Sequence, residues 1–125
     1  MKTAKKILLI NGRISPVWKK ALRDTALDLK RNLEEVNEDQ AEGVIWQNYD
    51  FIILDAGIIY ELSKFIAGII SHNPNARIVI FSSVPAWEEA RDVMLAGAVD
   101  YAYKTMNKTD IYSTLKKNLE ITSSS

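Results

Sequence analysis

The sequence contains no cysteine and a single histidine among its 125 residues. Without cysteine the chain can form no disulfide, thiolate zinc site, iron–sulfur cluster or cysteine nucleophile. With one histidine, a metal site within one chain cannot use two imidazole ligands. These classes of site are therefore excluded.

Long hydrophobic runs are also missing, and neither sign of charge is in excess. The apolar run behind the basic N-terminus covers only residues 7–10, whereas a signal-peptide core needs about 7–15 residues and a membrane span about 20. Sixteen basic residues balance sixteen acidic ones, which argues against binding of nucleic acid or an anionic membrane by this domain. We therefore expect a cytoplasmic protein without a membrane anchor.

Length and composition predict one compact domain. A chain of 125 residues, 47% hydrophobic and 26% charged, is typical of a single globular domain. We assign residues 1–121 to this domain and residues 122–125 to a disordered tail or linker stub.

Short apolar runs alternate with helical patterns along the chain. Parallel strands covered on both faces are predicted at residues 7–10, 51–54 and 78–81, with a weaker strand at 99–103. Apolar stripes at spacings of three and four predict helices from Trp18 to Leu33, Leu62 to Ile70, Trp87 to Met94 and Ile111 to Leu119. The three tryptophans, Trp18, Trp46 and Trp87, lie at apolar helix positions and are predicted to be core or interface residues.

The region between the first helix and the strand at 51–54 is less regular. We predict a polar edge strand near residues 34–37 and a short helix near residues 41–48. Five strands alternating with five helices then predict a doubly wound α/β fold. Its flavodoxin-like, five-stranded parallel sheet is expected to have the order 2-1-3-4-5.

Polar residues follow several of the predicted strands at their carboxyl ends. Residues 11–13 (NGR) follow the first strand, Asp55 the third, Ser82 the fourth and Lys104 the fifth. Ligands bind at this edge of such sheets, so we expect these side chains to converge on one crevice. A carboxylate there can act as a nucleophile toward phosphorus while an ammonium neutralises the phosphoryl oxygens. It is equally open that Asp55 caps a turn and Lys104 is a solvated loop residue.

Two longer segments resemble a known family. Residues 49–55 (YDFIILD) look like the segment that leads into the phosphoacceptor aspartate of bacterial two-component response regulators. Residues 90–104 (ARDVMLAGAVDYAYK) look like the passage that ends at the lysine of the same family. Over nearly its whole length the chain therefore resembles the receiver domain of these phosphorelay proteins.

This resemblance implies roles for four residues. Asp55 would be the phosphoacceptor, Ser82 the hydroxyl residue that senses the phosphoryl group, and Lys104 the lysine that pairs with it. Tyr101 falls where the family has an aromatic switch residue whose rotamer couples to the hydroxyl. The alternatives are a core aromatic at Tyr101 and a turn residue at Ser82.

The loop after the first strand departs from the family. Asn11-Gly12 stands where receiver domains carry the acidic pair that binds magnesium together with the phosphoacceptor, and no acid follows before Asp24. Magnesium usually needs one or two protein carboxylates. Asp55, helped at most by the Asn11 amide oxygen, would be its single carboxylate ligand, so we expect Mg²⁺ binding to be weak.

Two further differences concern Arg13 and Thr105. Arg13 could occupy the vacated metal space and pair with Asp55, or point into solvent. Thr105 follows Lys104 where the family typically has a cis proline. Because a non-proline cis bond costs about 2.5–4 kcal/mol, we expect a trans bond there.

The leading hypothesis is a signalling domain, not an enzyme, whose partner is a histidine kinase or another signalling protein. It is either phosphorylated weakly on Asp55 or is a pseudo-receiver, a protein-interaction switch independent of phosphorylation. A homodimer through the helix–strand–helix face of residues 86–119 is a further possibility. The alternative is a small flavodoxin-like cofactor-binding or enzymatic domain, which flavin absorbance would identify, although no phosphate-cradling loop is recognisable.

Overall fold

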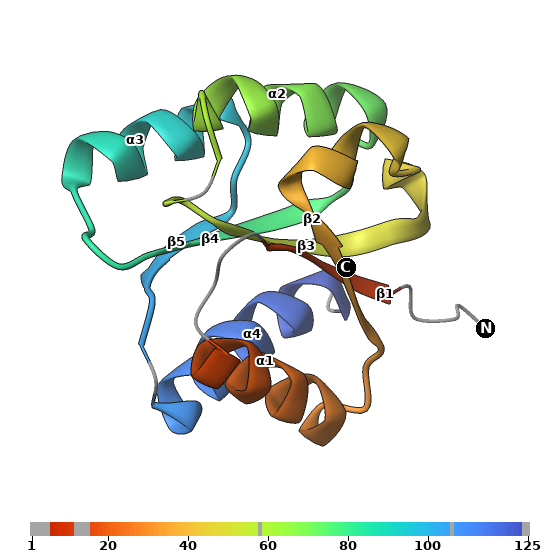
Figure 1. The fold of residues 1–125 in the computed structure, drawn as a ribbon, viewed down its shortest axis with the longest axis vertical. Helices are drawn as coiled ribbons and strands as arrows, with labels where there is room; N and C mark the ends of the chain where they lie inside the picture. Colours follow the sequence, from red (N-terminus) through yellow and green to blue (C-terminus); the bar gives the residue numbers. More distant parts are fainter. Residues whose placement is uncertain (1–5, 12–15, 58, 106, 124–125) are drawn as a thin grey trace.

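The computed structural model describes residues 6–11, 16–57, 59–105 and 107–123 (Figure 1). Its elements in chain order are β1 (Lys6–Asn11), α1 (Pro16–Asp28), β2 (Leu33–Asn37), the 3-10 turns η1 (Glu38–Gly43) and η2 (Trp46–Asn48), β3 (Tyr49–Asp55), α2 (Leu62–His72), β4 (Arg77–Ser82), α3 (Trp87–Ala96), β5 (Asp100–Tyr103) and α4 (Lys108–Ser123).

The five strands form one parallel sheet in the order β2-β1-β3-β4-β5, which confirms the predicted doubly wound, flavodoxin-like topology. Helices α1 and α4 cover one face of this sheet, and α2 and α3 cover the other (Figure 1). The central residues of the inner strands, 7–10 in β1, 51–54 in β3 and 78–81 in β4, are all apolar because both faces of the sheet are buried there. Among the described residues, no helix is long and apolar enough to cross a membrane.

Each face of the sheet has its own hydrophobic core. On the α1 and α4 side, the core includes Trp18, Leu22, Phe81 and Leu115. On the α2 and α3 side, it includes Ile52, Leu54, Ile66, Ile69 and Val93. Alternate residues of β3 belong to different cores, as the period of two in a strand requires.

Helix α1 ends earlier than its apolar stripe predicts. Lys30 has a left-handed backbone, with φ of 59°. The Lys30 amide donates to the carbonyl of Leu27, and the Arg31 amide donates to that of Ala26. This is a Schellman motif, which terminates the helix. The prediction that the stripe continues to Leu33 is therefore wrong, because Leu33 begins β2.

The segment after β2 also differs from the prediction. Instead of one helix over residues 41–48, it contains η1 and η2, separated by Val44 and Ile45 in extended conformations. Gly43 and two β-branched residues disfavour a continuous helix here. The described part of the chain thus contains four α-helices and two 3-10 turns, rather than five helices.

Two smaller expectations also change. Helix α4 runs through Ser123, beyond the domain boundary placed at residue 121, while residues 124 and 125 lie outside the described part of the chain. Trp87 is 70% exposed and is no core residue, with the Arg91 guanidinium 5.1 Å from the centroid of its ring.

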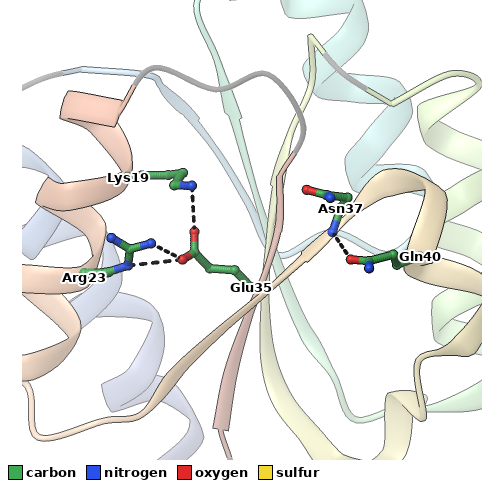
Figure 2. A network of polar contacts seen from close by, with 5 residues as sticks. All are labelled: Lys19, Arg23, Glu35, Asn37 and Gln40. Carbon is green, nitrogen blue, oxygen red and sulfur yellow. Dashed lines mark hydrogen bonds and ion pairs between the residues drawn. The ribbon is translucent and has the colours of Figure 1, made fainter.

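Edge strand β2 has two charged side chains, and one of them, Glu35, binds α1 (Figure 2). Glu35 accepts hydrogen bonds from Arg23, with Nε 3.1 Å from Oε2, and lies 3.4 Å from Nζ of Lys19. Burial raises the pKa of Glu35, but the hydrogen bond and charge of Arg23 and the charge of Lys19 outweigh this and lower it. On the other side of β2, the Asn37 amide donates to the Gln40 side chain and connects the strand to η1 (Figure 2).

At the amino ends of the strands, Tyr49 donates a hydrogen bond of 2.6 Å to Glu34, which also pairs with Lys6. Burial and this hydrogen bond to a carboxylate raise the pKa of Tyr49 to about 12. The hydrogen bonds from Lys6 and Tyr49 lower the pKa of Glu34.

This raised pKa predicts a loss of stability in alkaline solution. Because the folded pKa of Tyr49 lies above the ordinary value of 10.0, its contribution is fully present below pH 10 and is lost as pH rises toward about 12. We expect the difference in unfolding free energy between the protein and Tyr49→Phe to fall by about 1–2 kcal/mol over this window. Urea unfolding of both proteins between pH 10 and 12 measures this difference. A difference that stays constant with pH would contradict the raised pKa of Tyr49.

Candidate functional site

The carboxyl ends of three neighbouring strands form the candidate site. Asp55 is the last residue of β3, Ser82 is the last of β4, and Lys104 directly follows β5. The backbone continues the sheet pairing past these ends, since the Ala56 amide donates to Phe81 and the Lys104 amide donates to Ser82. The structure therefore places Asp55, Ser82 and Lys104 at the same edge of the sheet, as predicted.

The Asp55 carboxylate is buried and has a partner for each oxygen. Lys104 Nζ lies 2.7 Å from Oδ2, and the backbone amide of Gly57 donates to Oδ1 at 2.9 Å. The side chains of Asp55 and Lys104 are only 3% and 14% exposed. An ion pair removed from water in this way depends on both partners, because either charge alone would be poorly solvated. Lys104 is therefore not a solvated loop residue.

Ser82 is 5% exposed, and its hydroxyl oxygen accepts a hydrogen bond of 3.2 Å from the amide of Val84. This bond shapes the turn that leads from β4 toward α3. The structure thus supports a turn role for Ser82, while its role as a sensor of a phosphoryl group stays a prediction.

Tyr101 in β5 is directed toward the start of α3. Its hydroxyl donates to Oε1 of Glu89 at 2.5 Å and accepts a hydrogen bond from the amide of Ala86 at 3.2 Å. The ring is partly buried against the core beneath α2 and α3. Tyr101 is therefore more than a core aromatic, because its hydroxyl joins β5 to α3. Its coupling to Ser82 stays a prediction.

Trp18 is a residue of the site that the sequence analysis assigned only to the core or an interface. It is fully buried, and Lys104 Nζ lies 4.7 Å from the centroid of its ring. The ring also packs edge-on against Phe81, with centroids 5.5 Å apart and planes inclined by 69°. Trp18 lies in the first turn of α1, and this helix follows the carboxyl end of β1. That position was the signal that could have placed Trp18 at the carboxyl edge of the sheet.

Most of the loop after β1 lies outside the described residues. Asn11 is the last residue of β1 and is paired with Asn37 of β2, but its side chain is not described. Gly12 and Arg13 lie outside the described residues, so the hypothesis of an Arg13–Asp55 pair lies outside them as well.

The described residues do not fit a magnesium site of the kind that receiver domains use. No group of three histidine, cysteine, aspartate or glutamate side chains that could hold a metal occurs among them. The Asp55 oxygen Oδ2 is occupied by an ammonium, which repels a cation. In the sequence, no acid stands between β1 and Asp24 to supply the missing carboxylates.

The backbone after β5 agrees with the expectation for Thr105. No peptide bond between described residues is cis, so the bond from Lys104 to Thr105 is trans. The Thr105 amide donates to the carbonyl of Tyr103, which turns the chain tightly after Lys104.

Asp55 and Lys104 together offer a carboxylate and a positive charge for chemistry at this edge of the sheet. Asp55 offers a carboxylate oxygen as a nucleophile or as an acceptor of ions and hydrogen bonds. Lys104 offers a fixed positive charge 2.7 Å away. Such a pair can neutralise the oxygens of a transferred phosphoryl group, or it can hold one conformation of the site through the ion pair alone.

Comparison with known proteins identifies the fold. No protein-family model matches the sequence, and no curated protein is significantly similar to it. A response regulator from Thermotoga maritima has 18% sequence identity and a TM-score of 0.81, over 94% of this chain and 99% of that chain. An orphan response regulator of H. pylori has 16% identity and a TM-score of 0.79, over 95% and 99%.

A third similar structure is of a response regulator protein from Burkholderia pseudomallei with a phosphorylated aspartic acid, a calcium ion and citrate. Its identity is 21% and its TM-score 0.73, over 95% of this chain and 71% of that chain. At these identities the likeness establishes the fold. The chain has the fold of response regulator receiver domains.

Proposed function

We propose that this chain is a receiver-type signalling domain of a two-component system. Asp55 is its candidate phosphoacceptor, and Lys104 and Ser82 are the groups that would contact the phosphoryl oxygens. The observation that carries the proposal is the buried ion pair between Asp55 and Lys104, with a distance of 2.7 Å, at the carboxyl edge of a receiver-type sheet. The phosphorylated aspartic acid in the Burkholderia pseudomallei structure supports it by analogy.

In the proposed reaction, an Asp55 oxygen attacks the phosphorus of a phosphodonor. A phosphorus–oxygen bond forms, the bond to the leaving group breaks, and the leaving group takes that electron pair. Lys104 then shifts from the carboxylate to a phosphoryl oxygen, and the Ser82 hydroxyl exchanges its Val84 contact for a donated hydrogen bond.

The loop Asn11-Gly12 limits this reaction. Phosphoryl transfer commonly relies on a divalent cation to neutralise developing charge, and the acidic pair that would hold it is absent from this sequence. Lys104 then supplies a charge-assisted hydrogen bond of about 1.5–3 kcal/mol, and Ser82 a neutral one of about 1 kcal/mol. Complete switching, in which the ratio of the active to the inactive conformation rises from 1:99 to 99:1, needs about 5.5 kcal/mol. The domain is therefore proposed to be phosphorylated weakly, or to act through protein contacts independent of phosphorylation.

The proposed partner is a histidine kinase or another signalling protein. A second copy of the chain is the other proposed partner, bound through the face formed by α3, β5 and α4. Four large hydrophobic residues exposed on α3 and β5 support a protein contact there: Trp87 at 70%, Met94 at 45%, Leu95 at 81% and Tyr103 at 60%. Exposed aromatic and aliphatic groups of this kind are common at protein interfaces.

Intact mass spectrometry after incubation with a small phosphodonor tests the proposal. We expect a minor fraction of phosphorylated chain that depends little on added magnesium and is abolished by Asp55→Asn. Magnesium alone should bind no tighter than about millimolar, which corresponds to about 4 kcal/mol. Stoichiometric phosphorylation that requires magnesium would contradict the limited role given to the metal. Phosphorylation that persists in Asp55→Asn would contradict the choice of Asp55 as the phosphoacceptor.

A further inference from the structure

Trp18 has an unusual position for a tryptophan of a hydrophobic core. It is fully buried in α1, and its ring contacts both the Phe81 ring and the ammonium of Lys104. The same ammonium donates to Asp55 at 2.7 Å. Lys104 therefore has a carboxylate and an aromatic ring as its neighbours, in a place where its side chain is only 14% exposed.

Packing alone does not explain why this position holds tryptophan. The indole Nε1 is buried and has no hydrogen-bond partner among the described residues, an unfavourable state that phenylalanine or leucine would avoid. What the indole adds is the aromatic face that binds cations most strongly, and this attraction grows when the cation is desolvated. The contact with Lys104 supplies the cation.

We propose that Trp18 is a positioning residue that holds the ammonium of Lys104 beside Asp55. A lysine has a flexible four-carbon stem, so its charge is easily displaced unless a second contact fixes it. The ring and the carboxylate together fix the ammonium before any phosphodonor arrives. This inference rests on the proposed function for its role in phosphoryl transfer, but the positioning itself exists without that reaction.

Lysine side-chain NMR measures the positioning directly. In protein labelled at lysine, the Lys104 signals are assigned by their loss in Lys104→Met, and Lys20, whose side chain is 74% exposed, serves as the solvent-exposed reference. We expect Lys104 to have upfield-shifted Hε protons from the Trp18 ring current and a high order parameter at Cε. Trp18→Leu should remove the shift and raise the population of Lys104 rotamers away from Asp55 by about two- to thirtyfold, the range expected for a cation–π contact.

Two further variants separate positioning from general packing. Trp18→Phe retains an aromatic face and should keep an intermediate order parameter. Phe51→Leu removes a buried ring from the same core about 13 Å along β3 from Asp55, and should leave the Lys104 signals unchanged. If Trp18→Leu leaves Lys104 as ordered as before, or if Phe51→Leu loosens it equally, Trp18 is a core residue only and the inference fails.

A complementary measurement covers the case in which Trp18→Leu does not fold. In the variant Trp46→Phe/Trp87→Phe, the remaining tryptophan fluorescence comes from Trp18, and Lys104→Met should shift its emission. An unchanged emission would overturn the inference. Neither readout requires phosphorylation, so a chain that accepts no phosphoryl group but loosens Lys104 in Trp18→Leu would refute Asp55 as a phosphoacceptor and still support the positioning role of Trp18.

Discussion

Replacing Lys104 with methionine is expected to lower the free energy of unfolding by about 3–5 kcal/mol. Methionine keeps much of the apolar volume of the lysine stem but removes the ammonium that lies 2.7 Å from Asp55. The carboxylate, with its side chain 3% exposed, is then left with the Gly57 amide as its remaining hydrogen-bond donor among the described residues. Removing one partner of a buried pair leaves an uncompensated charge, which is the costly case.

Urea unfolding of the parent protein, Asp55→Asn, Lys104→Met and the double variant measures this effect. Asp55→Asn combined with Lys104→Met should recover most of the loss, because both charges are then absent, and the coupling energy of the cycle isolates the pair. Lys20→Met is a matched control, because Lys20 pairs with Asp24 at 2.8 Å on the surface of α1, where water screens the pair, so this variant should lose far less stability than Lys104→Met. A loss in Lys104→Met no greater than in Lys20→Met would contradict a buried pair.

The second large effect is expected at Gly97. This residue ends α3 with φ of 128°, and a Cβ atom there would lie 2.7 Å from Cγ1 of Ile70 on α2. Gly97→Ala therefore combines an unfavourable backbone conformation with overpacking between two helices. We expect it to lower the free energy of unfolding by about 2–5 kcal/mol.

Gly68→Ala is the matched control for this substitution. Gly68 lies inside α2, and a Cβ atom there would meet nothing within 4 Å. Alanine should therefore stabilise the protein by about 0.5–1 kcal/mol through its better helix propensity. Thermal or urea unfolding compares the two variants, and a Gly97→Ala protein as stable as the parent would contradict the packing of α3 against α2.

The strand order was predictable because each inner strand is a short apolar run that ends in a polar residue. The run at residues 51–54 becomes the buried part of β3, and Asp55 stands at its carboxyl end. A parallel sheet brings such ends to one edge, so the placement of Asp55, Ser82 and Lys104 followed from topology alone. Gly97 likewise marked the end of α3, since glycine favours the required positive φ.

Local deviations were harder to predict where the usual sequence signals are missing. Helix α1 ends in a Schellman motif at Lys30, a position usually held by glycine, so the apolar stripe suggested a longer helix. At the site, Trp18 fits an amphipathic helix stripe, which contains no information about the lysine that packs on it. The hydrogen bond from Tyr101 to Glu89 joins two residues twelve positions apart, on β5 and α3, and depends on the orientation of both side chains.

The most direct test of the central claim is NMR of Ser82, Tyr101 and Lys104 in the presence of magnesium with a phosphodonor or beryllofluoride. We expect the signals of Tyr101 and of α3 and α4 to stay largely unchanged. One ammonium and one hydroxyl do not bind a phosphoryl group tightly enough in one conformation, relative to the other, to switch the domain completely. Large, saturable shifts in all three residues that disappear in Asp55→Asn would contradict it, and would identify a fully active phosphoreceiver.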